Sequence, residues 1–249
     1  MRIAVCMSHV PDTTTRIRID DSGNKIDYTG VQWVINPWDE LALTRALELK
    51  ELPGSGITEV VVVNAGDTTA EPVIRKALAI GADRAIRIDL LPEDGMMTAR
   101  ALAEYFASEM FEVIMAGLES ADYNGGTVGA MLGGLLNRRT VNGVSSINLQ
   151  DGKWKVTREA GNVIQVIATE PPFVAIVQKG IAIVPRIPSM RGVMQARTKP
   201  LQVVKVNGQN AGSSTDSYTY PAKKGTCRMI DADNPDELIH LLKTEARVL

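Results

Sequence analysis

The residues best suited to bind a ligand lie in a short polar loop between two apolar segments. Asp122, Asn124, Gly125 and Gly126 follow an apolar run and precede apolar residues at helical spacing, namely Val128, Met131, Leu132, Leu135 and Leu136. Glycine lets a ligand approach the backbone closely, and the free N–H groups at the start of a helix attract anionic oxygens. The pattern therefore predicts a strand, a loop and a helix that bind an anionic ligand. A plain strand-to-helix turn uses the same residue types, so that alternative stays open.

The motifs of common catalytic and metal sites are missing from the sequence. The first predicted strand is followed by no Gly-x-Gly-x-x-Gly, and neither a Walker-type Gly-Lys-Ser/Thr nor a Gly-x-Ser-x-Gly motif occurs. The only histidines and cysteines are His9, His240, Cys6 and Cys227, whose spacing does not suit structural zinc. We therefore expect no catalytic residue and no metal ligand, which favours a binding or carrier role.

Strand-like and helix-like segments alternate through the first half of the chain. The predicted strands are residues 3–7, 58–64, 84–89 and 113–116, and the predicted helices are 37–50, 71–80, 97–110 and a helix from 128. This alternation predicts an α/β fold, a Rossmann-like parallel sheet with helices on both faces. Ligands of such sheets bind outside the carboxyl ends of the strands. The loops after Met7, Asn64 and Ala116 should therefore share one edge of the sheet.

The second half of the chain has a different pattern. Residues 143–148, 153–159 and 163–169 predict an antiparallel addition, and residues 173–177 predict another buried strand. We expect a nucleotide-binding domain over residues 1–200 and an arm over residues 201–249, with an extended linker and a terminal helix. A polar linker before an amphipathic helix suits a chain that reaches a partner. An ordinary terminal helix folded back on its own domain would show the same pattern.

Composition excludes several classes of partner. The formal net charge of the 249 residues is −2 and aromatic residues make up 4%, so neither a basic surface nor a stacking platform for nucleic acid is expected. The sequence shows no signal-peptide pattern and no apolar run long enough to cross a bilayer. We therefore expect a cytoplasmic protein without direct membrane insertion.

Four stretches of the sequence resemble the β subunit of electron-transfer flavoproteins. They are residues 5–14, 35–43, 74–84 and 185–200, and the resemblance runs from residue 1 to residue 249 in the family's order. It implies a Rossmann-like adenine-nucleotide-binding domain that pairs with an α subunit carrying most of the FAD site. It also implies a second nucleotide in the β subunit, which is AMP in ordinary members and a second FAD in electron-bifurcating members.

The resemblance implies a set of cofactor-binding residues around the polar loop. In this sequence they are Cys6, Asn36, Ala65, Gly66, Gly117, Asp122, Asn124, Gly125, Gly126, Thr127 and Val128, and Thr13 corresponds to a flavin-facing position. Asp122 would accept a hydrogen bond from ribose or adenine, and the amides of residues 125–128 would hold phosphate. The family usually has Lys-Gln where this chain has Leu118-Glu119, and Thr127 replaces a common Gln. These departures leave the choice between AMP and FAD open.

Residues 185–199 resemble the loop by which the family recognises dehydrogenases. The implied recognition residues are Ile187, Met190, Arg191, Val193, Met194, Arg197 and Lys199, with Met190 at the family's anchoring leucine. An unbranched thioether side chain fits a hydrophobic pocket adaptably, although Met190 could instead be a core methionine.

The resemblance implies an electron carrier that accepts electrons from acyl-CoA or similar dehydrogenases through FAD and passes them to a respiratory acceptor or a quinone-linked oxidoreductase. Alternatives are a bifurcating β subunit using NADH and two FADs, a stand-alone ATP- or AMP-binding regulatory domain, and an enzyme acting on an adenylate.

Overall fold

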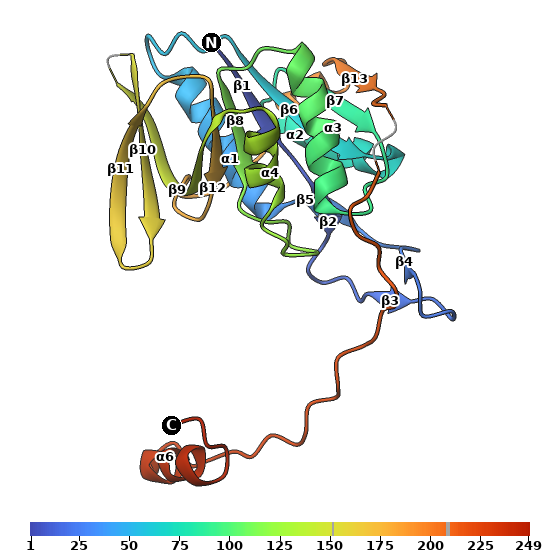
Figure 1. Ribbon diagram of the computed structural model, residues 1–249, viewed down its shortest axis with the longest axis vertical. Helices are drawn as coiled ribbons and strands as arrows, with labels where there is room; N and C mark the ends of the chain where they lie inside the picture. The colour runs from blue at the N-terminus through green and yellow to red at the C-terminus, as the bar shows by residue number, and fades with distance from the viewer. Residues whose placement is uncertain (151, 208–209) are drawn as a thin grey trace.

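A nine-stranded sheet in the order β11-β10-β9-β12-β8-β1-β6-β7-β13 forms the centre of the computed structural model, which describes residues 1–150, 152–207 and 210–249 (Figure 1). The parallel strands are β1 (Arg2–Cys6), β6 (Glu59–Gly66), β7 (Arg84–Asp89), β8 (Val113–Gly117), β12 (Phe173–Val177) and β13 (Leu201–Val204). The apolar run of β6 is buried on both sides, as expected for a central parallel strand. The predicted fold class is confirmed.

Three antiparallel strands extend one end of the sheet. They are β9 (Arg139–Gln150), β10 (Lys153–Ala160) and β11 (Val163–Thr169), and β9 joins them to the parallel part by pairing with β12. The turn between β10 and β11 contains Gly161 in a left-handed conformation with φ of 61°. β11 is the outermost strand on this side, and its Val163, Ile164 and Val166 are exposed. The predicted antiparallel addition is therefore present.

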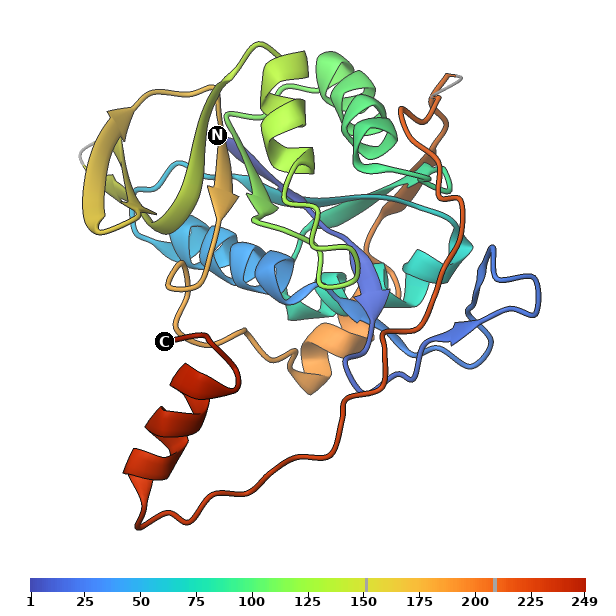
Figure 2. The same cartoon turned by 60° about the horizontal axis from the view of Figure 1, so that its bottom comes forward.

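Helices cover both faces of the parallel strands. On one face α1 (Pro37–Glu51) and α2 (Glu71–Ile80) pack on alternate strand residues such as Val5 and Val62. On the other face α3 (Gly95–Ser108) and α4 (Val128–Leu135) pack on the strand residues that point to that face, such as Ala4 and Val63 (Figure 2). α3 begins two residues before the predicted start because the Asp94 carboxylate caps it, accepting a hydrogen bond from the Met97 N–H at 2.7 Å.

Short elements lie beside the carboxyl ends of the strands. β2 (His9–Pro11) pairs with β5 (Trp33–Ile35), and between them β3 (Arg18–Ile19) and β4 (Ile26–Asp27) form a projecting hairpin. A 3₁₀ turn, η1 (Thr68–Ala70), follows β6. α5 (Met190–Ala196) packs on α2, and Gly192 is needed there because a Cβ on it would lie 2.3 Å from the Ala79 carbonyl oxygen.

The chain after β13 leaves the sheet domain as an extended arm, residues 205–249, of which residues 208 and 209 lie outside the described part. The arm passes the β3–β4 hairpin and ends in α6 (Pro235–Thr244), which stands away from the domain (Figure 1). α6 has no buried residue, so the alternative of a terminal helix folded back on its own domain is not observed. The predicted division after residue 200 stays a prediction, although β13 belongs to the sheet. Among the described residues, no helix combines the length and apolar character needed to span a bilayer.

Candidate functional site

The three loops predicted to share one edge of the sheet lie together at the carboxyl ends of the neighbouring strands β8, β1 and β6. The Met7 N–H donates a hydrogen bond to the Val63 carbonyl at 2.9 Å, and Asn64 Nδ2 donates to the Met7 carbonyl at 2.7 Å. These bonds fasten the loop after β1 to the end of β6. The predicted meeting of the loops is confirmed for this pair.

Asp39, in the first turn of α1, joins the loop after β1 to the end of β8. Its Oδ2 accepts from the Ser8 N–H at 2.8 Å, and its Oδ1 accepts from the Gly117 N–H at 2.8 Å. The side chain is only 3% exposed, and burial raises its pKa to about 6 against the opposing effect of the donors. Sequence reasoning assigned Asp39 only to a helical turn, because nothing in the sequence shows which distant N–H groups the carboxylate meets.

Asn36 holds the polar loop against the start of α1. Its Nδ2 donates to Asp39 Oδ2 at 3.0 Å and to the Glu119 carbonyl at 2.9 Å, and its Oδ1 accepts from the Ala121 N–H at 3.1 Å. Both polar atoms of this predicted cofactor-binding residue therefore have protein partners. The geometry makes Asn36 a positioning residue for the loop.

The nucleotide loop, residues 117–128, presents free backbone donors directly before α4. Asn124 and Gly126 have φ of 50° and 60°, so the backbone turns through left-handed conformations. Within the described residues, we find no hydrogen-bond acceptor for the N–H groups of Gly125, Gly126 and Thr127. Together with the first amides of α4, these groups form a concentrated set of donors for an anionic oxygen.

Small side chains lie at the strand ends under this loop. Cys6 and Ala116 are buried and Ala65 is half-buried, all on the face that α3 and α4 cover. Burial raises the pKa of the Cys6 thiol, so the thiol stays protonated and behaves as a small apolar group. Both cysteines are free. Cys6 and Ala65 thus pack in the same cluster as Leu118 and Val128 of the loop, and their role in binding a nucleotide stays a prediction.

The loop fits a phosphate through its backbone and not through charged side chains. Residues 117–128 contain no lysine or arginine, and Glu119 and Asp122 add negative charge. The Asp122 Oδ1 accepts a hydrogen bond from the Tyr123 N–H, and the side chain remains exposed to a ligand. Backbone amides would therefore supply the attraction for a phosphate here.

Four predicted glycines divide into two classes. A Cβ on Gly117 would lie 2.4 Å from Asp39 Oδ1, and one on Gly66 would lie 2.7 Å from Asn64 Oδ1. Gly117 and Gly66 are therefore required because any larger side chain would collide with a neighbouring side chain of the protein. In contrast, a Cβ on Gly125 would come no closer than 3.9 Å to Thr127 Oγ1, and one on Gly126 no closer than 3.8 Å to the Leu118 carbonyl. Open space beside Gly125 and Gly126 is what a ligand contact needs.

Thr13 lies apart from these loops, in the exposed segment between β2 and β3. Its neighbour Thr14 donates hydrogen bonds to Asp12, which shapes the turn. Among the described residues, no hydrogen bond ties Thr13 to the nucleotide loop, so its flavin-facing role stays a prediction.

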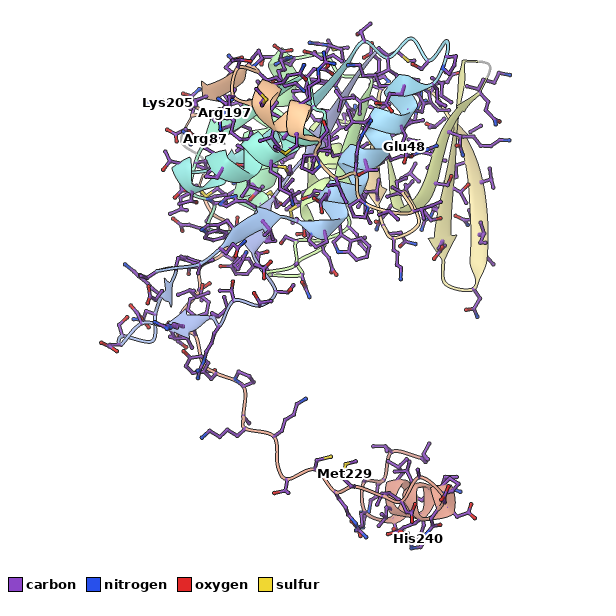
Figure 3. The ribbon with its side chains drawn as sticks, turned by 180° about the vertical axis from the view of Figure 1, so that it is seen from behind. Glu48, Arg87, Arg197, Lys205, Met229 and His240 are labelled. Atoms are coloured by element: carbon purple, nitrogen blue, oxygen red, sulfur yellow. The ribbon has the colours of Figure 1, made fainter. Side chains whose placement is uncertain are left out.

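The predicted recognition residues lie on and before α5. Ile187 is 83% exposed and Met190 is 82% exposed, which excludes Met190 as a core methionine. Val193, Met194, Arg191 and Arg197 are also exposed, and Arg197 directly follows α5 (Figure 3). These exposed side chains on and before α5 are therefore apolar or basic.

Lys199 differs from the other recognition residues. Its Nζ donates to the Leu78 carbonyl at 3.0 Å and to the Ala82 carbonyl at 2.6 Å, at the end of α2. Partial burial also lowers the pKa of this ammonium group. Lys199 therefore stabilises a helix C-terminus within the chain instead of presenting its charge outward.

Comparison with known proteins gives one family over most of the chain. The family model described as "Electron transfer flavoprotein domain" matches residues 24–208. The chain is 33% identical to the "Electron transfer flavoprotein subunit beta" of Syntrophomonas wolfei, over 95% of this chain and 92% of the relative. It is 30% identical to the protein of the same name from Bacillus subtilis, with both chains covered completely. The protein of that name from Homo sapiens is 28% identical over 82% of this chain and 81% of its own length.

Proposed function

This chain belongs to the electron transfer flavoprotein family as a β subunit, and from this premise we propose that it holds an adenine nucleotide in the loop before α4 while completing the FAD site of an α subunit. The observation that carries the proposal is the group of free amides at Gly125, Gly126 and Thr127. FAD, when bound, supplies the electron-transfer chemistry. The chain itself acts as an electron carrier subunit and not as a separate enzyme.

The residues of this chain would bind and orient the nucleotide. The amides of residues 125–128 would hold phosphate, and Asp122 would accept from ribose or adenine. Asp39 and Asn36 would keep the loop in register with the ends of β1 and β8. The nucleotide is AMP if the protein is an ordinary electron-transfer flavoprotein, and a second FAD if it is an electron-bifurcating one.

The arm and α6 fit a role in pairing with the α subunit. α6 carries Leu238 and Ile239 with nearly half of each side chain exposed, and no residue of the sheet domain covers them in the described structure. An amphipathic helix gains most of its stability from packing its apolar face. We therefore assign this face to the α subunit.

The exposed surface of α5 would dock the electron donors. Ile187, Met190 and Met194 offer apolar side chains, and Arg191 and Arg197 add positive charge. We propose acyl-CoA or related dehydrogenases as donors and a quinone-linked oxidoreductase as the acceptor. The cytoplasmic location stays a prediction.

The test is to co-express the chain with an α subunit of the family, purify the complex, and measure FAD and AMP per heterodimer. One FAD and one AMP would support the ordinary function. Two FADs without AMP, together with NADH oxidation, would assign the bifurcating type. A colourless chain that stays unpaired and binds ATP would refute the proposal in favour of a regulatory domain.

A further inference from the structure

The helix that carries most of the predicted recognition residues, α5, is too short and too exposed to hold its position by itself. Of its seven residues, only Ala196 is buried. A helix of this length is unstable in water without tertiary contacts, and α5 buries little apolar surface to supply them. Its position therefore depends on polar contacts with its neighbour α2, against which it lies (Figure 3).

Arg75, on α2, holds the C-terminal end of α5. Its Nη1 donates to the Ala196 carbonyl at 2.8 Å and to the Lys199 carbonyl at 2.8 Å. The last carbonyls of a helix have no partner within the helix and lie at the negative end of its dipole, so they attract a guanidinium group. Within the described residues, we find no other hydrogen bond of the Arg75 side chain. Arg75 thus anchors the end of α5 to α2.

Lys199 makes the reciprocal contact. It follows α5 in the chain, and its Nζ donates to the Leu78 and Ala82 carbonyls at the end of α2, at 3.0 and 2.6 Å. Each of the two segments therefore supplies a cation to the C-terminal carbonyls of the other. We call Arg75 and Lys199 the reciprocal clamp.

Further contacts fix the rest of the recognition segment. The Arg186 N–H donates to Thr44 Oγ1 at 2.9 Å and Arg186 Nη1 donates to Glu51 Oε1 at 2.8 Å, which fastens the chain before α5 to α1. Within α5, Gly192 approaches α2 so closely that a Cβ on it would collide with the Ala79 carbonyl oxygen. The segment that carries the exposed apolar side chains is therefore held at both ends.

We propose that the reciprocal clamp holds α5 in the conformation that the electron donor binds, which makes Arg75 a positioning residue for donor docking. The inference rests on the proposed function, because α5 is the surface assigned there to the donors. When only a fraction of the molecules has the binding conformation, the apparent affinity falls by that fraction. If loss of Arg75 leaves α5 correctly placed in about a tenth to a third of the molecules, the donor binds about 3- to 10-fold more weakly.

Arg75→Met removes the donors of the clamp and keeps a long side chain. The assay follows flavin reduction in the heterodimer by a medium-chain acyl-CoA dehydrogenase that is reduced with octanoyl-CoA, at varied heterodimer concentration. We expect the KM for the heterodimer to rise about 3- to 10-fold at an unchanged limiting rate, and Arg75→Lys to recover part of this loss.

Lys76→Met is the matched control. It removes a cation from the next position of α2, where Lys76 Nζ pairs with Glu40 Oε1 at 3.0 Å and not with α5. The loss of net positive charge is the same as in Arg75→Met, so general electrostatic attraction of the donor changes equally. The KM of Lys76→Met should therefore stay within twofold of the wild type, and an equal rise in both variants would overturn the inference.

A double variant tests whether Arg75 acts through α5. Met190→Ala removes an exposed apolar side chain of α5, so adding Arg75→Met to it should raise the KM by less than Arg75→Met does alone. Two effects that multiply in full would overturn the inference. If Arg75→Met does not fold, Lys199→Met takes its place, since it removes the other half of the clamp.

Hydrogen exchange of the heterodimer reports on the clamp without any donor. The amides of residues 193–199 should exchange about 3- to 10-fold faster in Arg75→Met than in the wild type or in Lys76→Met. Unchanged exchange, or faster exchange with an unchanged KM, would overturn this inference alone. A wild-type heterodimer whose flavin is reduced by dithionite but not by the dehydrogenase would overturn the proposed docking of donors, and this inference with it.

Discussion

Replacing Gly125 by alanine tests whether the nucleotide loop binds its ligand through the backbone. The new Cβ would meet only Thr127 Oγ1, at 3.9 Å, and the φ of Gly125 is outside the left-handed region. Alanine should therefore fit without strain and change the free energy of unfolding by less than about 1 kcal/mol, in the stabilising direction. A ligand that approaches this backbone would instead meet the added methyl group.

The expected loss of affinity follows from the donors involved. Hydrogen bonds to a charged group contribute about 1.5–3 kcal/mol each. Loss of one such bond, taken as about 2 kcal/mol, corresponds to about 30-fold weaker binding. The assay is calorimetric titration of AMP into the heterodimer after the resident nucleotide is removed, with urea denaturation of the same samples.

Gly134→Ala is the matched control. A Cβ there meets nothing within 4 Å, and Gly134 lies within α4 but outside the loop. This variant should gain up to about 1 kcal/mol of helix stability and bind AMP normally. Wild-type AMP affinity in Gly125→Ala, or an equal loss in Gly134→Ala, would refute the idea that these amides contact the ligand.

Three further results are expected. Burial raises the pKa of Asp39 to about 6 in the folded protein, so folded Asp39 keeps its proton to a higher pH than Asp39 in the unfolded chain. The stability of the wild type relative to Asp39→Asn should therefore fall by about 2 kcal/mol as the pH rises from 4 to 6 in urea denaturation, and parallel curves would contradict this. Met190→Ala should raise the KM for a partner dehydrogenase about 5- to 30-fold at unchanged stability. Met110→Ala, at an exposed position between α3 and β8, should change neither the KM nor the stability. Lys199→Met should lower the free energy of unfolding by about 1–2 kcal/mol, because two carbonyls at the end of α2 lose their donor, and the exposed Arg197→Met should not; equal stability of the two variants would exclude the capping role.

The fold was predictable where local signals and topology agree. α2 was predicted with its observed bounds, because Gly81 ends it. The common edge of the loops followed from the rule that parallel strands present their carboxyl ends together. The boundary of α3 was less accurate, because the capping role of Asp94 depends on its side-chain geometry.

The site was less predictable, because its details depend on contacts between distant residues. Gly66 and Gly117 have the same residue type as Gly125, yet packing against Asn64 and Asp39 explains them without a ligand. Lys199 belongs to a recognition segment by resemblance, but its ammonium group caps α2. Distances of this kind cannot be read from the order of residues along the chain.

The outermost strand, β11, has a consequence for how the protein is made. Its sequence from Val163 to Thr169 contains no charged residue and no proline, and three of its aliphatic side chains are exposed. Natural proteins usually interrupt such strands with lysine or proline, because an open backbone ladder recruits other chains indiscriminately. A cell that synthesises this polypeptide in large amounts should therefore accumulate insoluble material that forms through this strand.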